Sequence, residues 1–224
     1  MELTPALILA MWSAGISAGG AIVGWWRLVG PGYLWLTGAV VALSGVMLLL
    51  ADGGTLAAVS IGAAVVAALL GRSRVASTLG FALAAVLFGI VAGQDSPWFP
   101  IVTGSLVLGG ITTEMMLGHW YLVDPRLPRR PLLILDVLAA IGLVLEVVYV
   151  FAFGEVPFSG SDGVFGLAYV MLASFAAVLM VGVWFSLKEP RYSGVMAATG
   201  LSYLAVLVCF GVVTIGRVLI VGPS

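Results

Sequence analysis

The chain has 224 residues, of which 62% are hydrophobic and only 8% are charged, and its formal net charge at pH 7 is -1. A soluble domain carries about 25% charged residues, so this chain lacks the polar side chains needed to cover a globule in water. The near-neutral charge argues against a nucleic-acid partner. The single cysteine, Cys209, excludes a disulfide framework, a CxxC redox pair and a cysteine zinc site. The composition therefore predicts an all-α, polytopic integral membrane protein whose solvent is the lipid bilayer.

A membrane-spanning helix needs roughly 20 mostly apolar residues, within a range of about 17 to 25. Eight runs of the chain approach this length, and turn-forming glycine and proline residues separate them. We predict helices at residues 5–26, 33–51, 55–71, 77–93, 99–123, 131–153, 163–187 and 194–221. The third and fourth runs are short, so a single irregular hairpin is an alternative for that part of the chain.

The charges between these runs alternate along the chain. The first, third, fifth and seventh loops hold eight of the nine basic residues, namely Arg27, Arg72, Arg74, Arg126, Arg129, Arg130, Lys188 and Arg191. The second, fourth and sixth loops hold no basic residue and carry Asp52, Asp95, Glu155 and Asp162. Basic loops of multi-pass proteins face the cytoplasm, so eight helices with both termini on the non-cytoplasmic side fit this alternation. We expect a multi-pass protein of the cell (inner) membrane.

Residues 15–31 recur in weaker form as residues 109–125. An offset of 94 residues aligns GISAGGAIVGWWRLVGP with GGITTEMMLGHWYLVDP, and six of the 17 positions are identical. The shared GxWxLVxP pattern falls at the inner ends of the first and fifth predicted helices. The sequence thus predicts two four-helix transmembrane repeats, 1–95 and 96–224. Because each repeat would contain an even number of helices, the two would be parallel, related by an axis along the membrane normal.

The first and fifth predicted helices also carry small residues at helical spacing. Gly20 and Gly24 lie in the first, and Ser105 and Gly109 lie in the fifth. Small residues let two backbones approach closely, which is how helices associate in a solvent as apolar as their own side chains. We expect these two helices to occupy the interior of the protein.

Five ionisable side chains fall inside the predicted helices, where a charge costs roughly 2.5 to 3.5 kcal/mol on insertion scales. They are Glu114, His119, Asp136, Glu146 and Arg217, and all five belong to the second repeat. They are our candidates for a proton or substrate path. At 1.5 Å per residue, His119 and Asp136 lie about 6 and about 8 Å from the inner membrane surface, where the carboxylate could fix one imidazole tautomer. Glu114 lies deeper, at about 14 Å.

Helical geometry separates Glu114 from His119. The two are five positions apart, which is about 140° around a helix. Glu114 instead shares a face with Gly110 and Gly118, where it could form a hydrogen bond to a neighbouring helix.

Each of the other candidates has a structural interpretation beside its functional one. His119, Trp120 and Tyr121 form either an interfacial aromatic belt or a contact surface for a quinone. Glu146 and Arg217 are most simply a structural ion pair, or Arg217 extends to the outer headgroups.

No motif requires a cofactor or a metal, because one histidine and no paired ligand spacing leave too few ligands. Nothing supports an enzyme acting alone, and three functions remain open. The first is a small proton-linked transporter or carrier that uses Glu114. The second is a membrane-anchor or quinone-contacting subunit of a respiratory or redox complex, with an acidic partner docked on the loop of Arg126, Arg129 and Arg130. The third is a non-catalytic assembly or scaffold protein. The sequence leaves open a homodimer or a partner membrane subunit.

Overall fold

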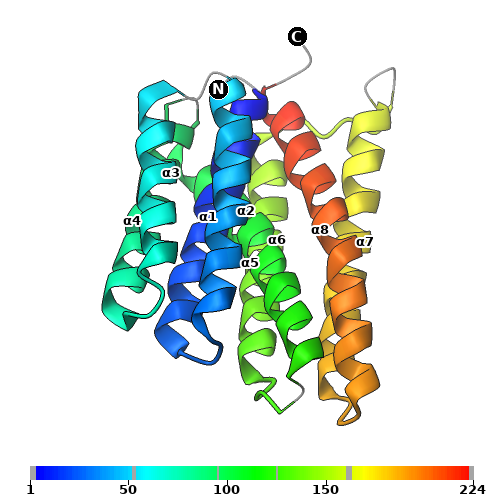
Figure 1. The fold of residues 1–224 in the computed structure, drawn as a ribbon. Helices are drawn as coiled ribbons and strands as arrows, with labels where there is room; N and C mark the ends of the chain where they lie inside the picture. The colour runs from blue at the N-terminus through cyan, green and yellow to red at the C-terminus, as the bar shows by residue number, and fades with distance from the viewer. Residues whose placement is uncertain (1–3, 52–53, 95, 125, 160–162, 222–224) are drawn as a thin grey trace. The chain divides into compact units, whose positions relative to one another are not determined.

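The computed structural model describes residues 4–51, 54–94, 96–124, 126–159 and 163–221. Over these ranges eight helices follow one another and no strand occurs (Figure 1). The helices are α1 Pro5–Trp26, α2 Pro31–Leu50, α3 Gly54–Leu69, α4 Arg74–Ala92, α5 Trp98–Val123, α6 Arg130–Phe153, α7 Gly163–Lys188 and α8 Tyr192–Val221. Four residues used in the sequence predictions lie outside the described ranges: Asp52, Asp95 and Asp162 of the acidic loops, and Pro125 of the repeated pattern.

Among the described residues, seven of the eight helices are long and apolar enough to cross a membrane, judged by length and composition. The exception is α3, whose 16 residues fall just short of the roughly 17 that a span needs. The two short predicted helices form as the separate helices α3 and α4, joined by a turn at residues 70–73, and not as one irregular hairpin. The structure therefore confirms a multi-pass helical architecture. The membrane it occupies and the side of its termini remain predictions.

Local sequence explains where several helices begin and end. At the start of α1, the Thr4 hydroxyl accepts a hydrogen bond from the Leu7 backbone N–H at 3.2 Å, and Pro5 fills the first position. Ser73 caps α4 in the same way. The C-terminal cap of α1 is Arg27, whose φ of 56° is left-handed and redirects the chain into the first loop.

The helices form two compact units, and the division falls inside α5. The first unit is residues 4–105, which holds α1 to α4 and the first two turns of α5. The second unit, among the described residues, is 106–221. In the first unit each helix packs on the next, and α4 packs along α1. In the second unit α7 packs much more extensively along α8 than along α6. The predicted boundary at residues 95–96 precedes this division, and the duplication remains a prediction.

Basic loops meet at one end of each unit. In the first unit, Arg27 Nη1 donates to the Arg72 carbonyl at 3.1 Å, and the Arg74 guanidinium lies 3.9 Å from the centre of the Trp25 ring. In the second unit, Arg129 donates to carbonyls of the loop between α7 and α8. Within a unit, then, alternate loops share an end, as an up-and-down order of helices requires.

Close backbone contact between α5 and α6 depends on two glycines. A Cβ atom at Gly110 would lie 3.1 Å from the backbone of Ala139, and one at Gly142 would lie 2.8 Å from the Val107 nitrogen. The absence of side chains at these two positions lets the two helix backbones approach each other closely there. α1 and α5 are also the most buried spans, with 78% and 72% of their most apolar stretches enclosed. This burial agrees with the expectation drawn from their small residues.

Candidate intramembrane carboxyl site

Glu114 is completely buried on α5, in the middle of the face that α5 turns to its neighbours. One turn before it, Gly110 contacts Ala139 of α6. One turn after it, Gly118 contacts Thr199 of α8, where an added Cβ would lie 2.7 Å from the Thr199 hydroxyl. Residues four apart lie on one face of a helix, so these contacts hold Glu114 between α6 and α8. As predicted, Glu114 shares a face of α5 with Gly110 and Gly118, and this face packs against neighbouring helices.

Ser202 of α8 is the hydrogen-bond partner of Glu114. The Ser202 hydroxyl is buried and lies within hydrogen-bond distance of Glu114 Oε2, and it also lies 2.8 Å from the Ala198 carbonyl oxygen. A serine hydroxyl has only one proton to donate. Ser202 can therefore donate to a charged Glu114 or to Ala198, but not to both. When it donates to Ala198, a protonated Glu114 can donate to the Ser202 oxygen, and both hydrogen bonds of Ser202 are kept.

Asp136 of α6 is the second buried carboxyl of this region. It is 2% exposed and lies one turn before Ala139, the residue of α6 that Gly110 of α5 contacts. Glu114 lies one turn after Gly110, so the two acids lie at a similar level on the adjoining helices α6 and α5. Within the described part of the chain, Asp136 Oδ1 and Glu114 Oε1 both lack a hydrogen-bond partner. Two acids with unpartnered oxygens in an apolar interior cannot both carry a charge cheaply. This pair, Glu114 and Asp136 with Ser202, is the candidate site.

Glu146 and Arg217 form a separate ion pair between α6 and α8. Arg217 Nη1 donates to Glu146 Oε1 at 2.5 Å and Nη2 donates to Oε2 at 3.1 Å, with both side chains fully buried. Gly216 lies beside the pair, because a Cβ there would lie 3.3 Å from Glu146 Oε1. Of the two structural interpretations of these residues, the ion pair is the one that forms. Asp136 and Glu146 are ten residues apart on α6, about 15 Å along its axis. The five candidates therefore separate into the two buried acids, the ion pair, and His119.

His119 does not meet Asp136. His119 is exposed, whereas Asp136 is buried, and no hydrogen bond or ion pair joins them among the described residues. The depth estimate placed both residues at one level, but it did not fix the direction in which each side chain points. His119 thus lies on a different face of α5 from Glu114.

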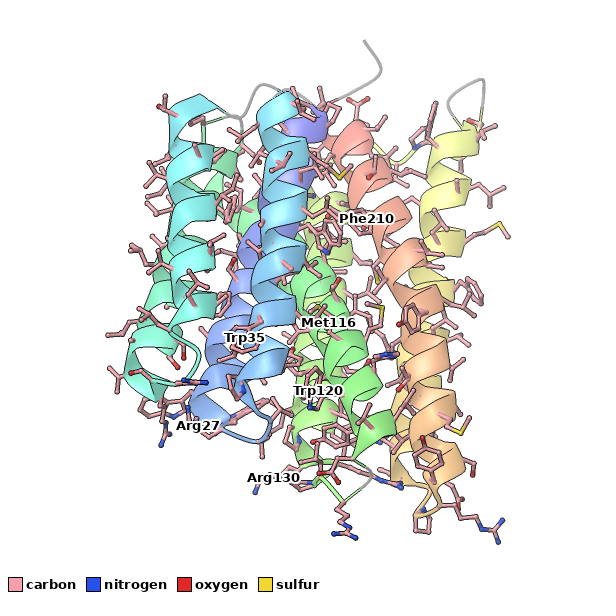
Figure 2. The ribbon with its side chains drawn as sticks, viewed as in Figure 1. Arg27, Trp35, Met116, Trp120, Arg130 and Phe210 are labelled. Carbon is pink, nitrogen blue, oxygen red and sulfur yellow. The ribbon has the colours of Figure 1, made fainter. Side chains whose placement is uncertain are left out.

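Tyr121 and Trp120, the predicted quinone contacts, differ in their surroundings. Tyr121 is buried, and its hydroxyl donates to the Pro128 carbonyl at 2.5 Å, which holds the loop between α5 and α6. Trp120 is partly exposed and lies one turn from Met116 on α5 (Figure 2). The Tyr121 contact is a structural one.

The basic loop is also partly structural. Arg129 donates to four carbonyl groups, those of Leu187, Glu189, Pro190 and Arg191, at the C-terminal end of α7. A cation at a helix C-terminus satisfies free carbonyls and opposes the helix dipole. Arg126 and Arg130 are exposed and take no part in this contact.

The described residues contain no cluster of three or more His, Cys, Asp or Glu side chains that could hold a metal ion. The carboxyl pair can instead bind and release protons or take up a single cation. Ser202 was missed by the sequence predictions. Its signal was the placement of Thr199 and Ser202 three residues apart on one face of an apolar helix.

Comparison of the chain with known protein families, curated proteins and solved structures finds no match.

Proposed function

We propose that the protein is a small proton-linked carrier in which Glu114 binds and releases the coupling proton. The observation that carries the proposal is the environment of Glu114. This carboxyl group is fully buried, has a hydroxyl at one oxygen, and lies at a similar level to the buried acid Asp136 on the adjoining helix. Structural carboxylates inside proteins are normally paired with a cation, as Glu146 is with Arg217. The described part of the second unit thus buries one acid that is paired with a cation, Glu146, and two that are not, Glu114 and Asp136.

Ser202 gives the proton a way to change the local structure. When Glu114 is charged, Ser202 donates to it and leaves the Ala198 carbonyl. When Glu114 is protonated, Ser202 returns to Ala198. Proton binding on α5 therefore changes the hydrogen bond between Ser202 and the Ala198 carbonyl of α8. A proton that favours one of two hydrogen-bonding states can in this way favour one packing of α5 against α8.

The remaining features of the proposal are the duplicated four-helix scaffold, the orientation with basic loops inside, and a location in the cell membrane. The meeting of basic loops at one end of each unit supports the orientation.

The alternative of a quinone-contacting subunit has less support, because the Tyr121 hydroxyl already donates a hydrogen bond to the Pro128 carbonyl. Arg126 and Arg130 would be the residues of the basic loop free to meet an acidic partner.

The test is a proton-driven charge movement. The purified protein would be reconstituted in proteoliposomes on a solid-supported membrane and exposed to rapid pH steps. We expect a transient current in the wild type, its loss in Glu114→Gln, and its retention in Glu155→Gln, which changes an exposed carboxyl. Equal currents in the wild type and Glu114→Gln would overturn the proposal.

A further inference from the structure

A groove runs between α6 and α7 on the surface of the second unit. It consists of two adjoining hollows of about 320 and about 330 Å³, and both are lined by Val137 and Trp184. The first hollow begins at Arg130, the first residue of α6, and the second continues past Asp136. Figure 2 shows Arg130 at the loop end of its helix. The groove therefore leads from the end of the helices toward Asp136.

The sequence explains why the groove exists. Ala140 of α6 and Ala177 of α7 line it, and such short side chains leave the space between the two helices unfilled. Val144 and Val181 also line it and are 60% and 54% exposed, so this surface is apolar. An exposed surface of this kind on a membrane-spanning helix faces hydrocarbon, and any occupant must have a large apolar part.

Asp136 is the one charged residue that lines the second hollow. Nine residues line this hollow, and the other eight have apolar aliphatic, thioether or aromatic side chains. Asp136 is 2% exposed, and its Oδ1 has no hydrogen-bond partner among the described residues. A carboxylate in such surroundings is costly unless a cation neutralises it. Glu114 on α5 lies one turn from the same contact of α5 with α6 as Asp136 does, and as an acid it supplies no positive charge.

The groove also disfavours a cation at its other end. Arg130 lies there, six residues and about 9 Å before Asp136 along α6. A positively charged ligand is therefore repelled at the Arg130 end and attracted at Asp136. The Trp184 ring lines both hollows and can pack against the apolar part of such a ligand.

We infer that the groove between α6 and α7 binds a lipophilic ammonium ion, with its charge on Asp136 and its apolar part along the valines and Trp184. This inference rests on the proposed carrier function and names its substrate class. The cation would enter from the membrane, along the groove, and reach the carboxyl pair on which the proton is bound. A neutral apolar molecule or an anion would leave Asp136 without a counter-charge.

The test uses dodecylammonium as the probe and dodecanol as its neutral counterpart. Binding of radiolabelled probe would be measured to the full-length protein in nanodiscs of zwitterionic lipid, with empty nanodiscs subtracted. We expect saturable binding of dodecylammonium to the wild type, and binding about tenfold weaker or more in Asp136→Asn, because a charge-assisted contact is lost. Dodecanol binding should not distinguish these two proteins.

A second pair of variants tests the groove without changing charge. Ala177→Phe fills the hollow, whereas Ala197→Phe enlarges an exposed alanine of α8 that does not line it. Binding should be lost in the first and kept in the second. Equal binding in the wild type and Asp136→Asn, or in the two alanine variants, would overturn the inference.

The two proposals can fail separately. Amine binding that depends on Asp136, together with proton currents that do not depend on Glu114, would contradict the carrier function and support the groove as a cation site. Currents that depend on Glu114, with amine binding that ignores Asp136 and Ala177, would remove the groove alone.

Discussion

Gly20 of α1, in the first unit, and Glu114 of α5, in the second, lie in different surroundings. The sequence offset of 94 residues pairs Gly20 of α1 with Glu114 of α5. At Gly20 the space is filled by neighbours, because an added Cβ would lie 2.9 Å from Thr37 Cγ2 and 3.2 Å from the Phe81 ring. At Glu114 the space holds a carboxyl group and the Ser202 hydroxyl.

The buried polar groups of the two units differ in the same way. In the described part of the first unit they are hydroxyls, and Ser13 and Ser44 form a hydrogen bond of 2.8 Å between α1 and α2. The described part of the second unit buries four acidic or basic residues, Glu114, Asp136, Glu146 and Arg217. Hydroxyls can be satisfied by the carbonyls of their own helix, whereas charges require partners from other helices. The buried charged residues that the proposed function uses therefore all lie in the second unit.

Breaking the ion pair of the second unit should have the largest effect on stability. Arg217→Met leaves Glu146 as an unpaired buried charge and should cost about 3–5 kcal/mol. Thermal unfolding in detergent would measure this loss, with Arg191→Met as the control because that side chain is 85% exposed. The double variant Glu146→Met, Arg217→Met should recover much of the loss. A single variant as stable as the wild type would contradict the role of the pair.

Placing an acid in the first unit should be the next most damaging change. Gly20→Glu puts a carboxyl group where Thr37 and Phe81 already lie, and a charge inside the membrane costs roughly 2.5–3.5 kcal/mol. Gly20→Gln has the same size without the charge and separates overpacking from charge burial. The difference between the two in unfolding temperature measures the charge alone. Wild-type stability in both variants would show that the first unit can hold the same site.

The contact of α5 with α6 should tolerate no added carbon. Gly142→Ala forces a Cβ toward Val107 and should destabilise the protein by about 1–3 kcal/mol, measured by the same unfolding assay. Gly200→Ala is the matched control, because a Cβ at Gly200 meets no atom within 4 Å. If both substitutions were neutral, the close approach of the two helices would not be required.

The smallest effect should come from the loop contact of Tyr121. Tyr121→Phe removes the hydrogen bond to Pro128 and should cost about 0.5–1.5 kcal/mol. Tyr203→Phe changes an exposed hydroxyl and should cost nothing. The unfolding temperatures of the two variants would be compared. A decrease in unfolding temperature for Tyr203→Phe alone would contradict the structure.

Helix positions could be predicted from the sequence because they depend on local properties. The length of an apolar run and the glycines and prolines beside it predict a helix at 99–123, and α5 spans Trp98–Val123. The Glu146–Arg217 pair could also be anticipated, since opposite charges in hydrocarbon have few other partners. The start of α8 at Tyr192, two residues before the prediction, shows the usual uncertainty at helix ends.

The partners of Glu114 could not be predicted in the same way. Depth along a helix follows from counting residues, but the rotation of a helix follows from packing against its neighbours. Counting residues gives His119 and Asp136 similar estimated depths, but the two do not meet, because contacts such as Gly110 on Ala139 set the rotation of α5. Ser202 lies 88 residues from Glu114, and only the packing of α8 brings it there.

The most direct test of the central claim is infrared difference spectroscopy of the protein in lipid during a pH titration. The account predicts a carboxyl C=O band that titrates reversibly, disappears in Glu114→Gln, shifts in Ser202→Ala and persists in Glu155→Gln. A band unaffected by Glu114→Gln, or no titrating band assignable to Glu114, would show that this residue does not exchange a proton and would contradict the account.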